Sequence, residues 1–533
     1  MKKFTIVLSI LIIPLVMSAQ KWERTYGQPN YKEWANDVIE FYDKGYYILG
    51  STEDMEWNFK TGINGDTLYN KFLFHNLYIH RDLSSVIDEN GNLYICGTII
   101  LDDAWPIVAK YDSCGQKVWC RVFVDDSFDD GVGMDLLLTE NGNIIVLVTH
   151  DSDDQIDQIL LYCLNNNGNL LWTESYASKN DHPEIAHAVA FNLYYYNNSY
   201  FIDGYCYWPY PGNPNHVYLK PLFIKIDSLF NEEWILPFGV PDSIVGEAYG
   251  TIPLNDTVYF GIGVRRSSAT FNQNSLLMFF NEQGEEIGYN QIPNSDFGEN
   301  VDFNTMWNIV KVNDTSFITK FYIGMNDTVF HGETVIDTSG TIHILKNQGP
   351  GNGTADLIKT SDNNYLEVTE VYESKGDKDI WLFKFDENLE SVPFDTNTYV
   401  YDSLCPYPIQ SGTIDITDCF IWTNIEDTPS PEEYYASLKT IPIKAYPNPS
   451  TEGQVTFEFQ NTEYLSPPLI PPQGGKQPHL VIYNVLGEKV HEERVYQYQG
   501  KGVVDVNGWR KGMYVAVVYS EGLPVGNCKF VIE

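Results

Sequence analysis

The chain has 533 residues, about three to four times the length of a typical domain, so more than one domain is expected. It carries 33 Lys and Arg against 72 Asp and Glu. The formal net charge of -39 would repel nucleic acid and anionic lipid surfaces. Hydrophobic residues make up 43% and aromatic residues 14% of the chain, which excludes intrinsic disorder for most of it.

The first residues, 1–19, are typical of a secretory signal peptide. A basic start at Lys2 precedes an apolar run from Phe4 to Val16, and small residues follow up to Ala19. The run is shorter than the roughly 20 apolar residues that span a bilayer, and no second stretch of that length follows. We therefore expect an exported mature chain without a transmembrane segment.

A repeated phrase runs through residues 20–400. An apolar strand ends in Asp or Asn, a turn brings Gly three residues later, and an aromatic residue follows four positions on. The clearest copies contain Asp112, Gly115 and Trp119, and Asn165, Gly168 and Trp172. Two alternating apolar strands precede each copy, with turns near Gly45, Gly91, Gly142, Asn198, Asp256, Asp314 and Asn364.

This pattern predicts an all-β chain with a seven-bladed β-propeller over residues 20–400, and a solenoid of the same repeats is the alternative. The stretch Trp22 to Gly27 reads as the end of a repeat unit, which would complete the last blade and close the ring. We interpret the Asp or Asn of each phrase as a turn cap, and the aromatic residue as packing between blades.

The sequence changes character near residue 440. From there on it holds 8 basic and 9 acidic residues, so the excess negative charge lies in residues 20–439. Residues 401–439 read as a connector, with a linker at Thr428–Pro431. Strand-like phrases separated by Gly turns then fill residues 440–533 and predict a small immunoglobulin-like β-sandwich.

The tail resembles the type A C-terminal sorting domain of the type IX secretion system of Bacteroidota. The residues that carry the resemblance are Tyr446, Pro447, Asn448, Pro449, Gly487, Gly512, Tyr514 and Lys529. The resemblance implies handling by the type IX secretion machinery and passage through the periplasm and across the outer membrane. Attachment to the cell surface or release would follow.

Eight cysteines are too few for a disulfide scaffold, but export makes an oxidising compartment plausible. We expect Cys405 and Cys419 to pair across a Pro-rich turn, and Cys114 and Cys120 flank a hairpin turn that would also allow a bond. The remaining four, Cys96, Cys163, Cys206 and Cys528, lie in apolar strand-like runs where a buried thiol is ordinary.

The chemical motifs are mostly missing. No nucleophile elbow, phosphate loop, zincin or dinucleotide-binding motif occurs, so we assign no catalytic residue and no required cofactor. An acidic run with Asp151, Asp153 and Asp157 is a candidate calcium site, although we favour a solvated loop, because charge runs usually face water. Four aromatic residues beside a Pro-Gly turn are candidates for ligand stacking, although we favour packing within the blade: Tyr205, Tyr207, Trp208 and Tyr210.

Complete repeats without a catalytic constellation favour a non-enzymatic exported protein, at the cell surface or released, whose propeller loops bind an extracellular protein or glycan. One alternative is a secreted hydrolase of glycans or peptides, with its site on the propeller axis. A structural surface or adhesion element is the other.

Overall fold

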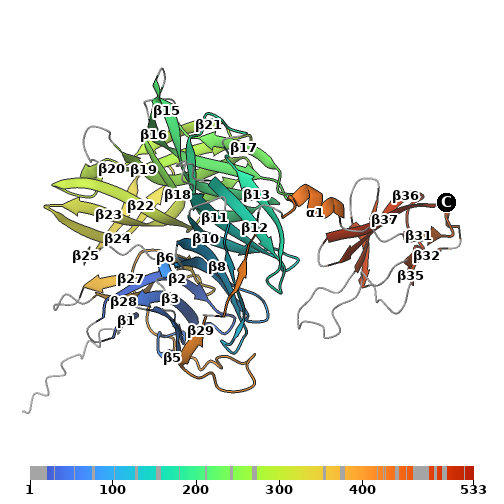
Figure 1. The fold of residues 1–533 in the computed structure, drawn as a ribbon, viewed down its shortest axis with the longest axis horizontal. Helices are drawn as coiled ribbons and strands as arrows, with labels where there is room; N and C mark the ends of the chain where they lie inside the picture. The colour runs from blue at the N-terminus through green and yellow to red at the C-terminus, as the bar shows by residue number, and fades with distance from the viewer. Residues whose placement is uncertain are drawn as a thin grey trace, which may run out of the picture.

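The computed structural model describes residues 21–437 and 443–533, and it is built almost entirely of strands (Figure 1). Gaps in the described part fall at 29–30, 53–54, 75–78, 101–102, 126–129, 152–157, 179–180, 211–212, 240–243, 267–272, 352–355, 373–377, 417, 424, 426–427, 452, 460–478, 485–488, 495–500 and 521–522. The expected signal peptide lies outside the described residues. No described helix has the length and apolarity needed to cross a membrane.

Among the described residues the repeats form seven sheets, each with four antiparallel strands, and two of these sheets gain a fifth, parallel strand from later in the chain. Blade 1 consists of β2 (Glu33–Glu40), β3 (Tyr46–Thr52), β4 (Glu56–Thr61) and β5 (Thr67–Phe74). Blade 2 consists of β6 (Ile79–Ile87), β7 (Leu93–Ile100), β8 (Ala104–Tyr111) and β9 (Lys117–Phe123). Blade 3 consists of β10 (Asp130–Leu138), β11 (Ile144–Asp151), β12 (Gln158–Leu164) and β13 (Leu170–Tyr176).

The next three sheets repeat the order. Blade 4 contains β14 (His187–Tyr196), β15 (Ser199–Tyr210), β16 (Asn213–Ile226) and β17 (Glu232–Pro237). Blade 5 contains β18 (Gly246–Asn255), β19 (Val258–Arg266), β20 (Gln273–Asn281) and β21 (Glu286–Gln291), which a 3-10 turn η1 (Asn294–Asp296) follows. Blade 6 contains β22 (Val301–Lys311), β23 (Ser316–Met325), β24 (Thr328–Asp337) and β25 (Ile342–Pro350).

The chain closes into a ring at blade 7. Its first three strands are β26 (Leu357–Lys359), β27 (Tyr365–Tyr372) and β28 (Lys378–Phe385), and its outer strand is β1 (Glu23–Tyr26) from the start of the chain. The first strand of each blade contacts the first strand of the next, and β26 contacts β2. A solenoid would leave these two ends apart, so the architecture is a closed propeller.

The repeated phrase connects several blades to the one that follows. Asp112 Oδ1 accepts the backbone N–H groups of Cys114 and Gln116 and so caps the turn, as the sequence predicted. The tryptophan at the end of the phrase reaches the next blade, where Trp119 Nε1 donates to Asn166 O at 3.0 Å. Trp234 and Trp22 repeat this contact on Glu282 O and Ile63 O, which confirms packing between blades.

After blade 7 the chain runs along the outer rim, and we call residues 401–437 the rim segment. Its strand β29 (Gly412–Asp415) lies parallel to β5, and β30 (Phe420–Trp422) lies parallel to β9. Pro429 O then accepts Thr173 N of blade 3, and helix α1 (Pro431–Ser437) contacts β13. The rim segment therefore crosses blades 1, 2 and 3.

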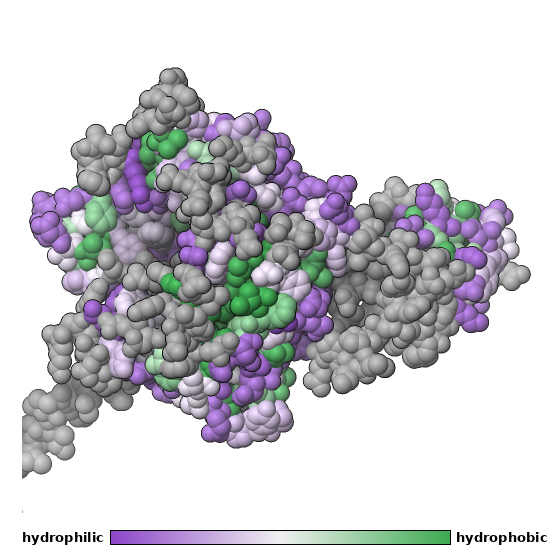
Figure 2. All heavy atoms as spheres, viewed as in Figure 1, coloured by the Kyte–Doolittle hydropathy of each residue, from purple (hydrophilic) through white to green (hydrophobic). Residues whose placement is uncertain are grey.

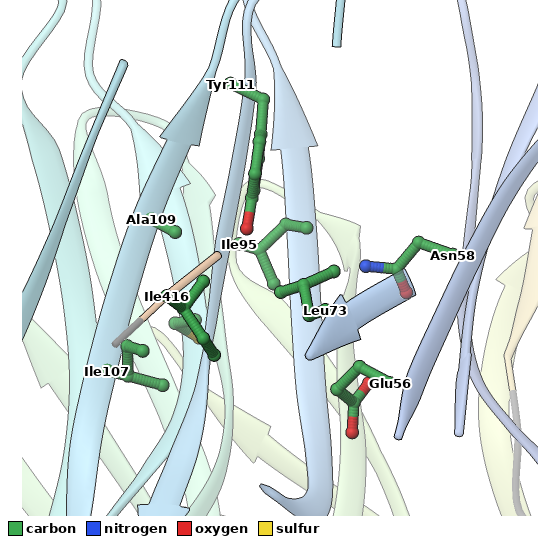
Figure 3. A pocket seen from close by; sticks show the side chains of 9 residues that line it. Glu56, Asn58, Leu73, Ile95, Ile107, Ala109, Tyr111 and Ile416 are labelled. Carbon is green, nitrogen blue, oxygen red and sulfur yellow. The ribbon is translucent and has the colours of Figure 1, made fainter. Parts of the chain in front are cut away.

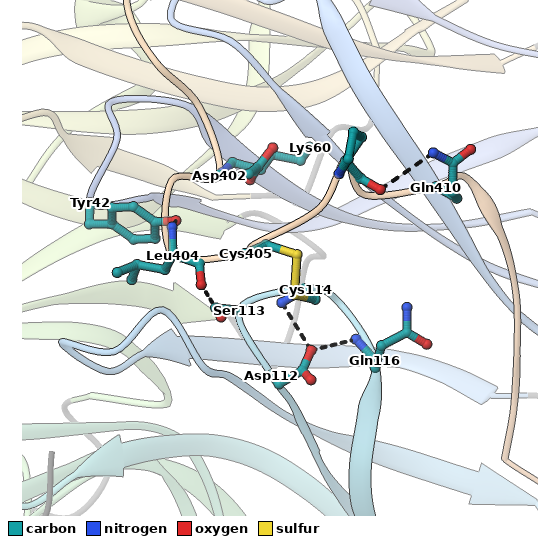
Figure 4. The surroundings of a disulfide bond; sticks show 11 residues. Tyr42, Lys60, Asp112, Ser113, Cys114, Gln116, Asp402, Leu404, Cys405 and Gln410 are labelled. Carbon is teal, nitrogen blue, oxygen red and sulfur yellow. Dashed lines mark hydrogen bonds and ion pairs between the residues drawn. A yellow bond between two sulfur atoms is a disulfide. The ribbon is translucent and has the colours of Figure 1, made fainter. Parts of the chain in front are cut away.

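Two disulfides fasten the rim segment to blade 2. Both predicted cysteines are oxidised, but the predicted pairings were wrong: Cys405 bonds to Cys114, and Cys419 bonds to Cys120. The reason is that β29 extends blade 1 between Cys405 and Cys419, while each of them reaches blade 2 separately. Figure 4 shows the first bond beside the capped turn at Asp112. The other four cysteines form no disulfide; Cys528 is partly exposed and the rest are buried.

The tail forms two sheets around its own core. One contains β31 (Ile443–Tyr446), β32 (Gln454–Phe459) and β35 (Lys501–Asp505). The other contains β33 (His479–Asn484), β34 (Lys489–Arg494), β36 (Gly512–Ser520) and β37 (Leu523–Ile532). Fully buried Phe457, Ile482 and Phe530 fill the space between the sheets, as expected of a β-sandwich.

Candidate functional site

An arc of aromatic rings follows the inner strands of blades 4, 5 and 6. We call it the aromatic arc, and it consists of Tyr207, Tyr205, Phe191, Tyr249, Trp307 and Tyr322. Successive ring centroids lie 5.8, 5.6, 5.5, 3.7 and 6.3 Å apart along this order. The closest pair, Tyr249 and Trp307, is stacked across the boundary between blades 5 and 6.

Backbone irregularities place these rings. Antiparallel pairing slips by one residue at Phe191 in β14 and at Tyr249 in β18, so each is the extra residue of a β-bulge. A bulge re-aims its side chain, and here the two rings meet across the boundary between blades 4 and 5. Phe191, Tyr205, Tyr207 and Trp307 remain partly exposed, whereas Tyr249 and Tyr322 are buried.

A charged pair lies beside the arc. Arg266 Nη2 is 2.7 Å from Glu247 Oε1, and the Tyr249 hydroxyl donates to Glu247 Oε2. Burial raises the pKa of Tyr249, and the adjacent Glu247 carboxylate raises it further. The phenol therefore stays protonated at neutral pH, and the site offers fixed hydrogen-bond groups next to flat rings.

The four predicted stacking residues do not lie together in the structure. Tyr205 and Tyr207 point to one face of β15 and join the arc. Trp208 points to the other face, where it packs against the core shared with blade 3 and lies under Lys220 at 5.0 Å. The side chain of Tyr210 lies outside the described residues.

Sequence reasoning missed Phe191, Tyr249 and Trp307. Each stands in an inner strand that reads as ordinary core alternation. A bulge has no reliable residue signature, although a shift in alternation at the same place of successive repeats would have been a usable signal.

A second group of polar side chains surrounds the propeller axis. Asp37 Oδ2 accepts the Ser85 hydroxyl at 2.6 Å, and Asp135 Oδ1 accepts the Ser84 hydroxyl at 2.7 Å. These bonds join blade 1 to blade 2 and blade 2 to blade 3. Asp356 accepts Asn308 Nδ2 at 2.8 Å and joins blade 6 to blade 7. The axial carboxyls thus tie neighbouring inner strands together.

These carboxyls are hard to ionise. Burial and the charge of Asp356 raise the pKa of Asp37 well above its ordinary value. Burial raises the pKa of Asp135 to about 6 and that of Asp203 to about 7. Asp203 is fully buried, and it accepts Asn192 Nδ2 at 2.7 Å and the Thr251 hydroxyl at 3.0 Å. These buried, hydrogen-bonded carboxyls are therefore suited to holding neighbouring strands together.

Two more carboxyls share a buried site between blades 6 and 7. Glu333 and Glu367 are fully buried, and Lys320 Nζ lies 3.3 Å from Glu367 Oε1. Burial raises the pKa of both carboxyls. A glycosidase needs two carboxyls that reach its substrate. With 0% exposure, this pair does not meet that requirement in the structure.

The predicted calcium site cannot be placed. Asp151 pairs through its backbone with Asp130 at the end of β11, whereas Asp153 and Asp157 lie outside the described residues. In the part of the chain that the structure describes, no three His, Cys, Asp or Glu side chains form a group suited to a metal ion. Calcium therefore stays a prediction for the acidic loop.

A small cavity lies between blades 1 and 2, where Ile416 of the rim segment covers it (Figure 3). Its volume is about 20 Å³, enough for a single water. Within the described structure, Glu56 Oε2, Asn58 Oδ1 and Tyr111 OH have no hydrogen-bond partner. Burial raises the pKa of Glu56 well above its ordinary value, which disfavours the charged form of this carboxyl. The cavity is too small for a metabolite.

In the tail, the motif residues hold the last strand. Asn448 Nδ2 donates to Lys529 O at 3.1 Å, and Asn448 Oδ1 accepts Val531 N at 2.9 Å. Tyr514 donates to Arg510 O at 2.7 Å. Gly487 lies outside the described residues. One asparagine near the start of the sandwich thus fixes the C-terminal strand.

Residues 444–533 match the family described as secretion system C-terminal sorting domain. The topology and this match define the class: an exported β-propeller protein with a type IX sorting domain. The sorting domain directs export across the outer membrane, to the cell surface or to release.

No curated protein matches the chain. Matches among solved structures include Drosophila Semaphorin 2a, with 9% identity and a TM-score of 0.40 over 97% of this chain and 98% of that one. Another is the extracellular domain of a one-component system of B. thetaiotaomicron, with 10% identity and a TM-score of 0.39, covering 97% of this chain and 58% of that one. All of these matches are distant.

Proposed function

We propose that this protein is an exported binding protein whose propeller holds a glycan or protein ligand on the aromatic arc of blades 4, 5 and 6. The observation that supports this most directly is the set of partly exposed rings in blades 4 and 6, which the buried ring of Tyr249 in blade 5 connects. Aromatic faces supply large contact area at low entropic cost, and the Glu247–Arg266 pair beside them supplies directed polar groups.

A glycan suits the arc better than a compact protein surface. Sugar rings have flat apolar faces that stack on aromatic rings, and their hydroxyls pair with carboxylate and guanidinium groups. Hydrolysis is not part of the proposal, because Glu333 and Glu367 are fully buried.

The test is a screen of glycan and peptide arrays with the mature full chain, with and without calcium, followed by analysis of the eluted ligand. For the best ligand, Trp307→Ala and Tyr205→Ala should each weaken binding at least tenfold. Tyr195→Ala is the matched control, because Tyr195 is 46% exposed at the opposite end of β14.

Intact ligand with loss of binding in the arc variants supports the proposal. Equal loss in the Tyr195 variant, or unchanged binding in the arc variants, refutes the arc as the site. Cleaved ligand would instead favour the hydrolase alternative.

A further inference from the structure

A groove opens on the rim where the rim segment passes from blade 2 to blade 3. Its volume is about 490 Å³. We call it the rim groove, and its lining is Leu170, Phe420, Ile421, Trp422, Thr423, Thr428 and Pro429. It lies between β30, the outer strand of blade 2, and β13, the outer strand of blade 3. This place is remote from the aromatic arc on the inner strands.

The strand beside the groove has an open edge. Trp422 O accepts Val124 N, so the backbone of Trp422 faces β9. In a parallel pair successive residues direct their backbone groups to opposite sides, which turns the N–H and C=O of Ile421 outward. No strand in the described part of the chain pairs with that side of β30. An open edge of this kind is a template for another strand.

The edge is also apolar and exposed. Phe420 is 56% and Ile421 48% exposed, although both belong to a strand. Figure 2 shows a green hydrophobic patch in the part of this face where Figure 1 draws orange rim-segment strand. Natural edge strands are normally protected by charged residues or by Pro, and β30 has neither.

The charge of the surroundings selects the partner. The rim segment contains no Lys or Arg and seven acidic residues, Asp402, Asp415, Asp418, Glu426, Asp427, Glu432 and Glu433. Lys60 pairs with Asp402 and Lys117 pairs with Asp418, and the segment remains net negative. A second copy of this chain, at a net charge of -39, would be repelled. A cationic segment would be attracted.

We propose that the rim groove binds an extended peptide of another protein, with apolar residues at its centre and Lys or Arg at its ends. The peptide adds as a strand to the open edge of β30. Its backbone pairs with Ile421, its alternate side chains enter the groove between β30 and β13, and its basic ends face the acidic rim segment. This site is independent of the ligand proposed for the aromatic arc.

The probe is the fluorescent peptide KKTVTVTKK, titrated with the mature full chain at low salt and followed by anisotropy. Ile421→Pro removes only the outward N–H and leaves the side that pairs with β9, so the fold should survive. We expect this variant, and Ile421→Lys, to bind the peptide at least tenfold more weakly. Added salt should weaken binding to the parent chain.

The matched control is Ile287→Lys, because Ile287 is 57% exposed in β21, the outer strand of blade 5. This variant should bind like the parent. The peptide EETVTVTEE, and KKTVTVTKK with alternate N-methyl groups, should both fail to bind. Thermal unfolding of every variant separates loss of the site from loss of the fold.

The proposal is wrong if the basic peptide fails to bind at about 1 mM. It is also wrong if Ile421→Lys and Ile287→Lys reduce binding equally, or if the N-methylated peptide binds as well as its parent. Sedimentation of the chain alone gives a further outcome. A dimer that Ile421→Lys dissociates would make a second copy the occupant and would overturn the assignment to a basic peptide.

Discussion

Trp119 of blade 2 lies directly over the bare α-carbon of Gly168 in blade 3. A Cβ at Gly168 would come within 2.8 Å of the indole, and the same indole donates to Asn166 O. Gly168 also has a φ of 74°, which side chains rarely adopt. The position therefore serves both the turn and the contact between blades.

Gly168→Ala should destabilise the propeller more than Gly142→Ala. Gly142 has a similar φ of 82°, but a Cβ there would meet nothing within 4 Å. Gly142→Ala should therefore lower the free energy of unfolding only by the cost of the left-handed backbone, about 1–2 kcal/mol. The displaced indole should add about 1–3 kcal/mol at Gly168. Calorimetry of the two variants measures the difference in their melting temperatures. Equal melting temperatures would contradict a stabilising contact between Trp119 and Gly168.

The buried carboxyl of Asp203 predicts an unusual pH dependence. The pKa of Asp203 in the folded chain is about 7, above its ordinary value of 3.8, so the folded state keeps a proton that the unfolded state releases. Stability from this group is complete below about pH 4 and is lost as the pH rises through 7. We expect the melting temperature to fall between pH 5 and pH 8.

Asp203→Asn should remove part of that fall. Relative to the parent chain, the variant should therefore gain more stability at pH 8 than at pH 5. Asn keeps a side chain that bonds to Asn192 and Thr251 without a charge. Asp314→Asn is the control, because the Asp314 side chain is 92% exposed. A pH profile of Asp203→Asn that matches the parent would rule out this carboxyl as the cause.

The two disulfides should be strongly non-additive. While one disulfide remains, the other closes a loop of only about 20 residues. Replacing the two cysteines of one bond by Ser, either Cys114 with Cys405 or Cys120 with Cys419, should therefore lower the free energy of unfolding by about 3 kcal/mol. Removing the second bond then opens a loop of about 290 residues and should cost about 5–6 kcal/mol more. Melting temperatures of the two double-Ser variants and the quadruple variant test this. Simple additivity would contradict it.

Asn448→Ala should reduce export. The change removes both hydrogen bonds to the last strand of the sorting domain, which costs about 1–3 kcal/mol in a domain of some ninety residues. Asn527→Ala is the control, since Asn527 is exposed in the same strand. Immunoblots of periplasm, cell surface and medium would show retention of the first variant. Equal export of both would show that the bonds of Asn448 are dispensable.

Local signals made the fold accessible from the sequence. The turns predicted near Gly91, Gly142 and Asn198 join the first two strands of their sheets, because Gly and Asn adopt the positive φ that these hairpins need. The closing strand after Trp22 could also be predicted, because the sequence there matches the end of a repeat unit.

The disulfide partners and the arc depend on distant contacts instead. Cys405 finds Cys114 only because the rim segment follows the edges of blades 1 and 2, a path set by short parallel strands without a repeat signature. Tyr249 meets Trp307 because a bulge rotates it toward the next blade. Neither contact leaves a pattern within about ten residues of sequence.

Trp22, Trp119 and Trp234 each donate to a carbonyl of the following blade and not of their own. A blade with this contact therefore lacks one hydrogen-bond acceptor until the next blade has folded. Where the ring closes, the blade after blade 7 is blade 1. The strand β1 is made first but pairs with β28 of the last blade, so blade 7 cannot close until nearly the whole chain is present. We expect nascent or truncated chains to stay protease-sensitive until blade 7 is present, and the whole ring then to gain protection together.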